Sequence, residues 1–277
     1  MKQQLFLALV LALLFQAPQA LAQNTNSQRA QELPRGHEFK SAFNGLPPQA
    51  KAKAQNWLDT LDEIPYEDFD YLKVDQEGNV LYADSFNSET SGSTTNGNTS
   101  PAIEEVTASE VFTLHSKPGA SKVVYIDFDG HVLSGTAWNN SAGVSTLYAR
   151  PYDSDGNENS FSSAEITDMA AIWHRVAEDY APFDIDVTTQ EPSSFGPNVS
   201  RILITNRTDS RGEYIYKNSA GGVAYVNVWG LSNYEYYQPA LVFYNHLGTG
   251  NAHNLAEAAS HELGHNLSLS HDGTSTT

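Results

Sequence analysis

The sequence predicts an α/β (α+β) fold in which a mixed, mostly parallel and twisted sheet of about five strands is accompanied by two long helices. Three observations support this prediction. An apolar run that ends in an acidic turn, "KVVYIDFDG" at 122–130, is typical of a buried strand. A helical pattern follows it over 160–183, and four short strand-like runs then precede a second helical pattern. A strand, helix, strand order implies a right-handed crossover and at least partly parallel pairing.

Each element has its own signal. In the first helix, Ser162 and Glu165 form an S-x-x-E capping box, apolar residues repeat at helical spacing, and Pro182 ends the element. The second helix is expected to start at Asn254, with Glu257 in the third helical position. The four strands between them are expected at 183–190, 200–206, 221–230 and 239–245.

The N-terminus reads as a secretory signal peptide over residues 1–22. Lys2 provides positive charge, the run 5–15 is apolar but short for a bilayer, and Ala20 and Ala22 suit a signal peptidase. An uncleaved membrane anchor is the alternative. The sequence therefore predicts an exported protein, secreted or periplasmic, with no membrane contact after cleavage.

A small unit precedes the larger domain. Residues 23 to about 46 are polar and are expected to be loosely ordered, a short helix opened by proline is expected within 47–64, and two strands are expected within 70–84. The Ser/Thr/Asn/Gly-rich segment at 85–108 reads as a linker. This layout favours a pro-region at 23–84 on a zymogen whose catalytic domain occupies 109–277, and an accessory domain on a stalk is the alternative.

Composition excludes several function classes. The formal charge of −18 argues against binding to nucleic acid or anionic lipid. Because the chain has no cysteine, it has no disulfide and no thiolate nucleophile, and a zinc site must use His, Asp or Glu. Any latency must likewise come from a carboxylate, a histidine or steric blockage.

The stretch "HELGHNLSLSH" at 261–271 predicts a metal site. On a helix, His261 and His265 lie about 40° apart on one face, with Glu262 at their flank and leucines on the other side. His271 would lie roughly 9 Å further along a continuous helix, so the chain must reverse near Ser268 for it to join them. Three His ligands would leave one zinc position open for water, which is the catalytic arrangement.

The roles follow from this spacing. Zinc would acidify a water molecule and polarise a peptide carbonyl, and Glu262 would act as general base and then protonate the leaving amine. Two rivals stay open. One is a zinc peptidase in which two histidines and a distant glutamate are the ligands. The other is an exported zinc-binding or adhesion protein with an inactive, protease-like domain.

The motif resembles the metzincin zinc signature H-E-x-x-H-x-x-G-x-x-H, and Asp272 after it resembles the reprolysin (adamalysin-like) branch, in a secreted bacterial group. The resemblance implies a metzincin-like upper subdomain, a zinc endopeptidase acting on protein or peptide substrates, and a supporting position for Asp272 behind the zinc ligands. It also implies an edge strand that pairs with extended substrate, matched by the run from Gly222 through Val223 and Ala224 to Tyr225.

The sequence departs from that family in two places. Ser268 stands where the family has glycine, and the methionines Met1 and Met169 both lie upstream of the motif, where no methionine turn can form beneath the zinc. The resemblance therefore implies a chain truncated before its methionine turn, which could bind metal and still be inactive. The sequence does not indicate an oligomeric state.

A second metal is a weaker candidate. Asp153, Asp155, Asn157 and Asn159 alternate before the first helix and could hold calcium, although a solvated turn is the simpler interpretation. Asp127 and Asp129, at the end of the first strand, could also be calcium ligands, although such residues more often cap a turn. The remaining histidines lack ligand spacing among themselves and are expected to be structural, namely His115, His131, His174, His246 and His253.

Overall fold

The computed structural model describes residues 24–85, 106–248 and 251–271. The expected signal peptide at 1–22 and most of the expected linker at 85–108 lie outside the described residues. Among the helices within the described ranges, none has the length and apolar character that a membrane span requires.

The larger part of the chain contributes five strands to one sheet, as the sequence predicts. β3 (Lys122–Asp127) pairs in parallel with β6 (Ile185–Thr188) and β7 (Val199–Thr205), and β7 pairs in parallel with β9 (Ala240–Phe243). β8 (Gly222–Tyr225) runs antiparallel to β9. The prediction of a mixed, mostly parallel sheet is therefore confirmed.

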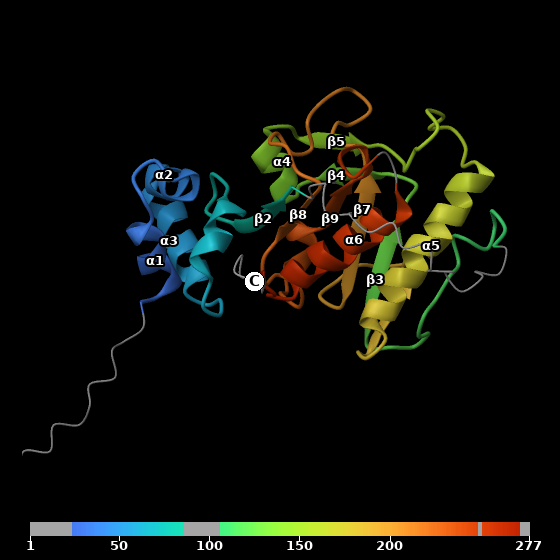
Figure 1. Ribbon diagram of the computed structural model, residues 1–277, viewed down its shortest axis with the longest axis horizontal. Helices are drawn as coiled ribbons and strands as arrows, with labels where there is room; N and C mark the ends of the chain where they lie inside the picture. Colours follow the sequence, from blue (N-terminus) through green and yellow to red (C-terminus); the bar gives the residue numbers. More distant parts are fainter. Residues whose placement is uncertain (1–23, 86–105, 249–250, 272–277) are drawn as a thin grey trace, which may run out of the picture.

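Two helices cover one face of this sheet. α5 (Ser163–Tyr180) begins at the predicted Ser162 and Glu165 capping box, and α6 (Ala252–Asn266) packs beside it (Figure 1). Their apolar side chains meet β-branched residues of β3, β6, β7 and β9 in a single buried cluster. This cluster holds α6 firmly against the sheet, so the polar side of α6 is positioned by the core.

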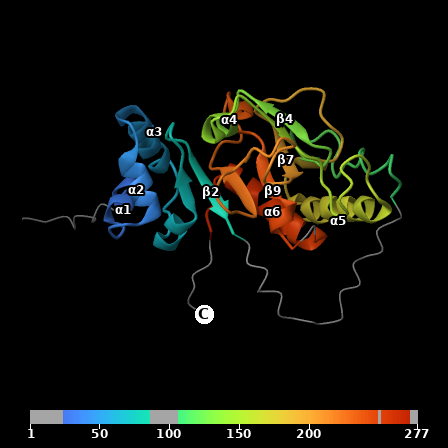
Figure 2. The same cartoon turned by 90° about the horizontal axis from the view of Figure 1, so that it is seen from above.

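The opposite face carries elements that the sequence patterns did not reveal. β4 (His131–Ser134) and β5 (Thr146–Ala149) form a separate antiparallel pair, joined by the short helix α4 (Ala137–Ala142). Figure 2 shows them on the side of the sheet away from α5 and α6. Trp138 of α4 is fully buried and donates to the Pro239 carbonyl at 3.0 Å, which explains why so short a helix is retained. Two 3-10 turns, η3 (Tyr234–Tyr237) and η4 (Tyr244–His246), flank β9.

The N-terminal unit is a folded structure with its own core. It contains α1 (Asn26–Glu32), α2 (Glu38–Gly45), α3 (Pro48–Leu58), the 3-10 turn η1 (Tyr66–Asp70), β1 (Leu72–Val74) and β2 (Val80–Asp84). The helix opened by proline and the two strands are as predicted. The expectation that residues 23–46 are loosely ordered is wrong, because Phe39 and Phe43 pack into a buried cluster with Phe69.

The N-terminal unit extends the main sheet. β1 pairs with β2, and β2 pairs antiparallel with β8, so the sheet has seven strands in the order β1-β2-β8-β9-β7-β3-β6. Figure 1 shows α1, α2 and α3 gathered at one end of the molecule, with β2 reaching into the larger part. The unit therefore contacts the larger part through a strand ladder.

Candidate metal centre

Both ends of α6 are determined by local hydrogen bonds. The N-cap of the helix lies three residues before the predicted one, because the Asn251 side chain accepts from the backbone N–H groups of His253 and Asn254. At the other end Ser268 adopts φ 77°, and the Leu269 N–H donates back to the Gly264 carbonyl at 2.9 Å. This is a Schellman-type C-cap, and it is the chain reversal that the position of His271 requires.

The reversal brings the three predicted histidines together through the same ring atom. The Nε2 of His261 lies 2.9 Å from the Nε2 of His265 and 3.1 Å from the Nε2 of His271. Four ligands at about 2.0–2.1 Å from one tetrahedral ion would stand roughly 3.3–3.4 Å apart. The observed separations are close to that edge length, so small shifts would place all three nitrogens around one cation.

His265 is oriented for this role by its surroundings. Its Nδ1 lies 2.8 Å from the Leu269 carbonyl and donates to it, which leaves the Nε2 lone pair directed at the other two histidines. Burial lowers the pKa of His265, and a neutral imidazole is the form that binds a metal. The Tyr82 ring stacks on the His265 imidazole with centroids 4.2 Å apart, so the imidazole cannot rotate freely.

A carboxylate from the N-terminal unit completes the cluster. The two oxygens of Asp84, at the end of β2, lie 3.2 Å from the Nε2 of His265, 3.2 Å from that of His271 and 3.5 Å from that of His261. Among the described residues, Asp84 and the three histidines form a group whose ligand atoms all lie within 4.8 Å of one another. Burial alone would raise the pKa of Asp84, but its contacts with the three imidazoles lower it below the ordinary value.

The sequence analysis missed Asp84, although a signal was present. Asp84 ends a short apolar strand directly before the Ser/Thr/Asn/Gly-rich segment, and a cysteine-free chain leaves carboxylates as the acidic metal ligands. Nothing in the local pattern, however, indicates that β2 would lie against β8. That placement depends on tertiary contacts between residues far apart in the sequence.

A second carboxylate supports His271 from outside. Asp68 accepts from the His271 backbone N–H at 3.0 Å, and its Oδ1 lies 3.4 Å from His271 Nδ1. The Tyr82 hydroxyl donates to the same carboxylate at 3.0 Å. Burial would lower the pKa of His271, but Asp68 and Asp84 raise it to about 9. The centre is thus arranged to hold positive charge between Asp84 and the imidazoles.

The donor set fits a divalent cation such as zinc. Three imidazole nitrogens and one carboxylate are ligands that zinc takes in tetrahedral sites. His265 uses its Nδ1–H on the Leu269 carbonyl, so its Nε2 carries a lone pair that can bind a cation, and the other two Nε2 atoms and the Asp84 carboxylate converge on the same place. One cation in the centre would satisfy all four groups together.

Glu262 lies beside this centre without a hydrogen-bond partner among the described residues. Its side chain is 0% exposed, and both carboxylate oxygens are buried and unpaired. Burial, and then the charge of Asp84, raise the pKa of Glu262 well above its ordinary value. The carboxylate lies against Gly222, where an added Cβ would stand 2.1 Å from Glu262 Oε1. Glycine is therefore required at 222 because there is no space for a Cβ. Its φ lies outside the left-handed region, so backbone conformation is not the reason.

The run that the resemblance implies as an edge strand for substrate forms a strand, β8, but its edge position needs correction. β8 is the outermost strand of the sheet contributed by residues 106–271, but it is not the edge of the whole sheet. β2 occupies its outer side, with Asp84 opposite Gly222, Ala83 opposite Val223, Tyr82 opposite Ala224 and Leu81 opposite Tyr225. The sequence pattern identifies a strand but not the neighbour that covers it.

The other predicted site residues lie outside this cluster. Asp272 is not among the described residues. At the calcium candidate, the Asp153 carboxylate accepts from the backbone N–H groups of Asp155, Gly156 and Asn157, and Asp153, Asp155 and Glu165 lie close enough to share an ion. Buried Asp127 forms an ion pair with Arg201.

The histidines expected to be structural have partners elsewhere or lie apart from the centre. His115 pairs with Asp186 at 2.7 Å, and His174 and His253 each face a glutamate one helical turn away. His246 accepts from Arg207 at 3.0 Å. None of these belongs to the metal-compatible groups found among the described residues.

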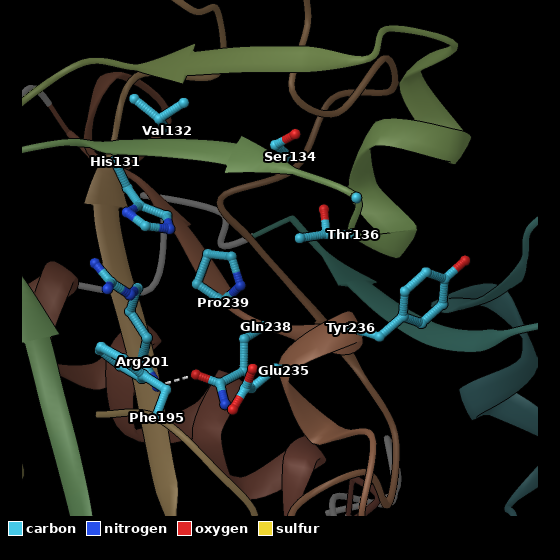
Figure 3. A pocket seen from close by; sticks show the side chains of 11 residues that line it. His131, Val132, Ser134, Thr136, Phe195, Arg201, Glu235, Tyr236, Gln238 and Pro239 are labelled. Carbon is cyan, nitrogen blue, oxygen red and sulfur yellow. Dashed lines mark hydrogen bonds between the residues drawn. The ribbon is translucent and has the colours of Figure 1, made fainter.

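A separate pocket of about 430 Å³ lies on the side of β4 and η3 (Figure 3). His131, Arg201 and Gln238 line it, and the Gln238 side-chain oxygen accepts from the Arg201 backbone N–H at 3.0 Å. Burial and the Arg201 charge lower the pKa of His131 to about 4. The pocket contains none of the three clustered histidines, and the Arg201 charge is already paired with Asp127 and Glu191.

Comparison with known proteins agrees with this location of the site. Residues 145–272 match the model of the Metallo-peptidase family M12B, Reprolysin-like. The matched range includes α5, β6 to β9, α6 and all three clustered histidines, but not Asp84. Searches among curated proteins and among solved structures each returned no match.

Proposed function

Because residues 145–272 match the model of a reprolysin-like metallopeptidase family, we propose that this protein is the precursor of a secreted, zinc-dependent endopeptidase. The observation that carries the proposal is the convergence of His261, His265 and His271 through Nε2, with the unpaired carboxylate of Glu262 beside them. A reprolysin-like metallopeptidase domain indicates a zinc-dependent hydrolase that acts on proteins or peptides. The residue roles, the export and the precursor state belong to the proposal.

The proposed chemistry assigns a task to each side chain. The three histidines hold zinc, which when bound supplies a Lewis acid that polarises the scissile carbonyl and acidifies water. Glu262 takes a proton from the attacking water and returns it to the leaving amine. Both carboxylate oxygens of Glu262 are buried without a hydrogen-bond partner among the described residues, so they are available for that exchange.

Substrate would bind on β8 as an added strand. The outer side of β8, from Gly222 through Val223 and Ala224 to Tyr225, is paired with β2 in this structure, so a peptide would bind there in place of β2. An extended peptide gains main-chain hydrogen bonds in this mode without a particular side-chain sequence. The Gly222 end of the strand lies against Glu262, so a peptide bound there would pass the proposed base.

Export and processing rest on the N-terminal sequence. We propose that the signal peptide at 1–22 directs secretion and that the pro-region at 23–84 is followed by the linker at 85–108. The catalytic domain then begins near residue 109. Calcium at Asp153, Asp155 and Glu165 is not part of this proposal, because backbone N–H groups already occupy Asp153 and Glu165.

The decisive experiment separates metal binding from catalysis. In processed protein, from which the N-terminal unit has been removed, Glu262→Gln should lower casein hydrolysis by about 10²–10⁴-fold, because the proton shuttle is lost. Zinc content measured by atomic absorption should stay at the wild-type value. Glu257→Gln is the matched control, because Glu257 lies on the same helix and its side chain is 61% exposed. Hydrolysis that survives Glu262→Gln would contradict the proposed role.

The rival functions predict different results in the same assays. If the ligands were two histidines and a distant glutamate, His271→Ala would leave zinc content and affinity unchanged. If the domain were an inactive binding or adhesion module, wild-type protein would bind zinc and, even after removal of the N-terminal unit, show no hydrolysis that a chelator abolishes. The proposed function instead expects His271→Ala to lose both zinc and activity.

A further inference from the structure

The strand β2 brings two separate blocking features to the centre at once. Its backbone covers the outer side of β8, and its last residue, Asp84, places a carboxylate among the three histidines. Asp84 is only 5% exposed, so the carboxylate belongs to the interior of the assembled molecule. A surface ion pair that formed by chance would not combine both features.

The ladder between β2 and β8 is continuous up to the carboxylate. The Val226 N–H donates to the Val80 carbonyl at 3.1 Å, and the Gly221 N–H donates to the Asp84 carbonyl at 2.7 Å. Between these bonds, four consecutive residues of β2 face four of β8. The Asp84 carbonyl is therefore hydrogen-bonded within the ladder, and this bond keeps the end of β2, with its carboxylate, close to the histidines.

Side chains of the N-terminal unit reinforce this position. Tyr82 stacks on His265, and its hydroxyl donates to Asp68, which in turn holds the His271 backbone. On the other side of β2, Trp57 Nε1 donates to the Val226 carbonyl at 3.0 Å. The unit therefore contacts both the residue that follows β8 and the histidine cluster through groups other than Asp84.

From this arrangement we propose that the N-terminal unit keeps the metal centre latent by using β2 as a substrate-like strand and Asp84 as the fourth metal ligand. This inference rests on the proposed function. The carboxylate occupies the position that a catalytic site leaves open for water. The same strand occupies the backbone groups to which an extended peptide would bind. Removal of the unit would uncover both the fourth metal position and the outer side of β8. The same step that removes the unit would therefore activate the enzyme.

The test follows the coordination of cobalt(II) in the full chain. Metal-free protein is titrated with cobalt, and its visible d–d absorption reports the ligands around the ion. Asp84→Asn should change that spectrum and weaken cobalt binding by about tenfold or more. Asp70→Asn is the matched control, since Asp70 lies in the same unit, loses the same charge and is 75% exposed. Its spectrum and affinity should equal those of the wild type.

A second measurement tests with a small ligand whether the fourth metal position is filled. Acetohydroxamic acid, a small metal-binding ligand, should leave the spectrum of cobalt-loaded wild type unchanged, because the fourth position and the strand edge are both filled. On Asp84→Asn it should bind at least about tenfold more tightly. Equal binding to both proteins would overturn the inference.

The outcomes separate the two proposals. An unchanged spectrum in Asp84→Asn, with cobalt still bound by the histidines, would overturn the inference and leave the proposed function standing. Cobalt binding that survives the double change His261→Ala and His265→Ala would overturn the metal site itself, and this inference with it.

Discussion

At the scale of single residues, the candidate centre depends on space as much as on charge. Glu262 has no hydrogen-bond partner among the described residues and lies in a volume that only a glycine at 222 leaves free. A buried carboxylate without a partner opposes folding, and such costly groups are typical of functional sites. Under the proposed function, the unpaired carboxylate reacts with a bound water.

The contact between Gly222 and Glu262 supports a residue-scale prediction. Gly222→Ala should lower the free energy of unfolding by about 1–3 kcal/mol, because the new Cβ would displace a fully buried side chain. Urea denaturation measures this change. Gly196→Ala is the control, since a Cβ there meets nothing within 4 Å.

A double-mutant cycle sharpens the same prediction. If the clash with Glu262 is the cause, Gly222→Ala should cost at least about 1 kcal/mol less when Glu262 is already alanine. Equal costs in the two backgrounds would assign the effect to the β8 backbone and not to the carboxylate.

At the scale of elements, the C-terminal end of α6 is the decisive structure. The helix presents His261 and His265, but only the turn after Asn266 returns His271 to them. The Asn227 N–H donates to the His265 carbonyl at 2.9 Å, and the Asn266 side chain donates to the Tyr225 carbonyl at 2.8 Å. The helix end is thus fastened to β8 and the residues after it, which keeps the histidines and the proposed substrate strand in fixed relation.

The turn at Ser268 supports an element-scale prediction. Ser268→Gly should raise the free energy of unfolding of the metal-free protein by about 0.5–1 kcal/mol. The left-handed conformation at φ 77° strains serine, while glycine adopts it freely and offsets only part of the gain through its unfolded state. Differential scanning calorimetry in the presence of a chelator measures the change.

A second left-handed residue provides the comparison for Ser268. Asn227 has φ 56°, and asparagine tolerates this region better than serine does. Asn227→Gly should therefore bring a smaller gain. If Ser268→Gly brings no gain at all, the turn is not the strained element inferred from its dihedral angle.

At the scale of the whole molecule, the N-terminal unit and the larger part are joined by a strand ladder and a cluster of ionisable groups. Asp68 and Asp84 come from the unit, and the histidines come from α6 and the turn after it. Opening this interface would leave Asp84 apart from the imidazoles that lower its pKa. Unfolding of the two parts is therefore expected to be coupled.

Metal binding at the interface supports the prediction at this scale. A cation that binds the folded chain at 100 times its dissociation constant adds about 2.7 kcal/mol to the free energy of unfolding. Chelation with EDTA should accordingly lower the melting temperature of wild type, measured by calorimetry. The double change His261→Ala and His265→Ala should abolish the response to EDTA, and an unchanged response would place the bound metal elsewhere.

Local patterns were sufficient for the elements that carry the site. The alternation at 183–190 and the capping box at Ser162 predicted β6 and the start of α5, because both depend on neighbours in the sequence. The segments at 23–46 and around Trp138 were not recognised, since their order comes from burial against distant residues. The sequence predicted the N-cap at Asn254 and not at Asn251, because both asparagines offer a suitable side chain.

The sequence by itself determined the candidate ligands and their chemistry. The spacing of His261, His265 and His271 requires a helix followed by a reversal, and backbone geometry allows few ways to meet that requirement. Only the tertiary structure decided what faces those ligands. Strand pairing between β2 and β8 joins residues about 140 positions apart, with Asp84 opposite Gly222. No local propensity encodes such a partner, because register and neighbour are set by the shared core and by which edge remains free.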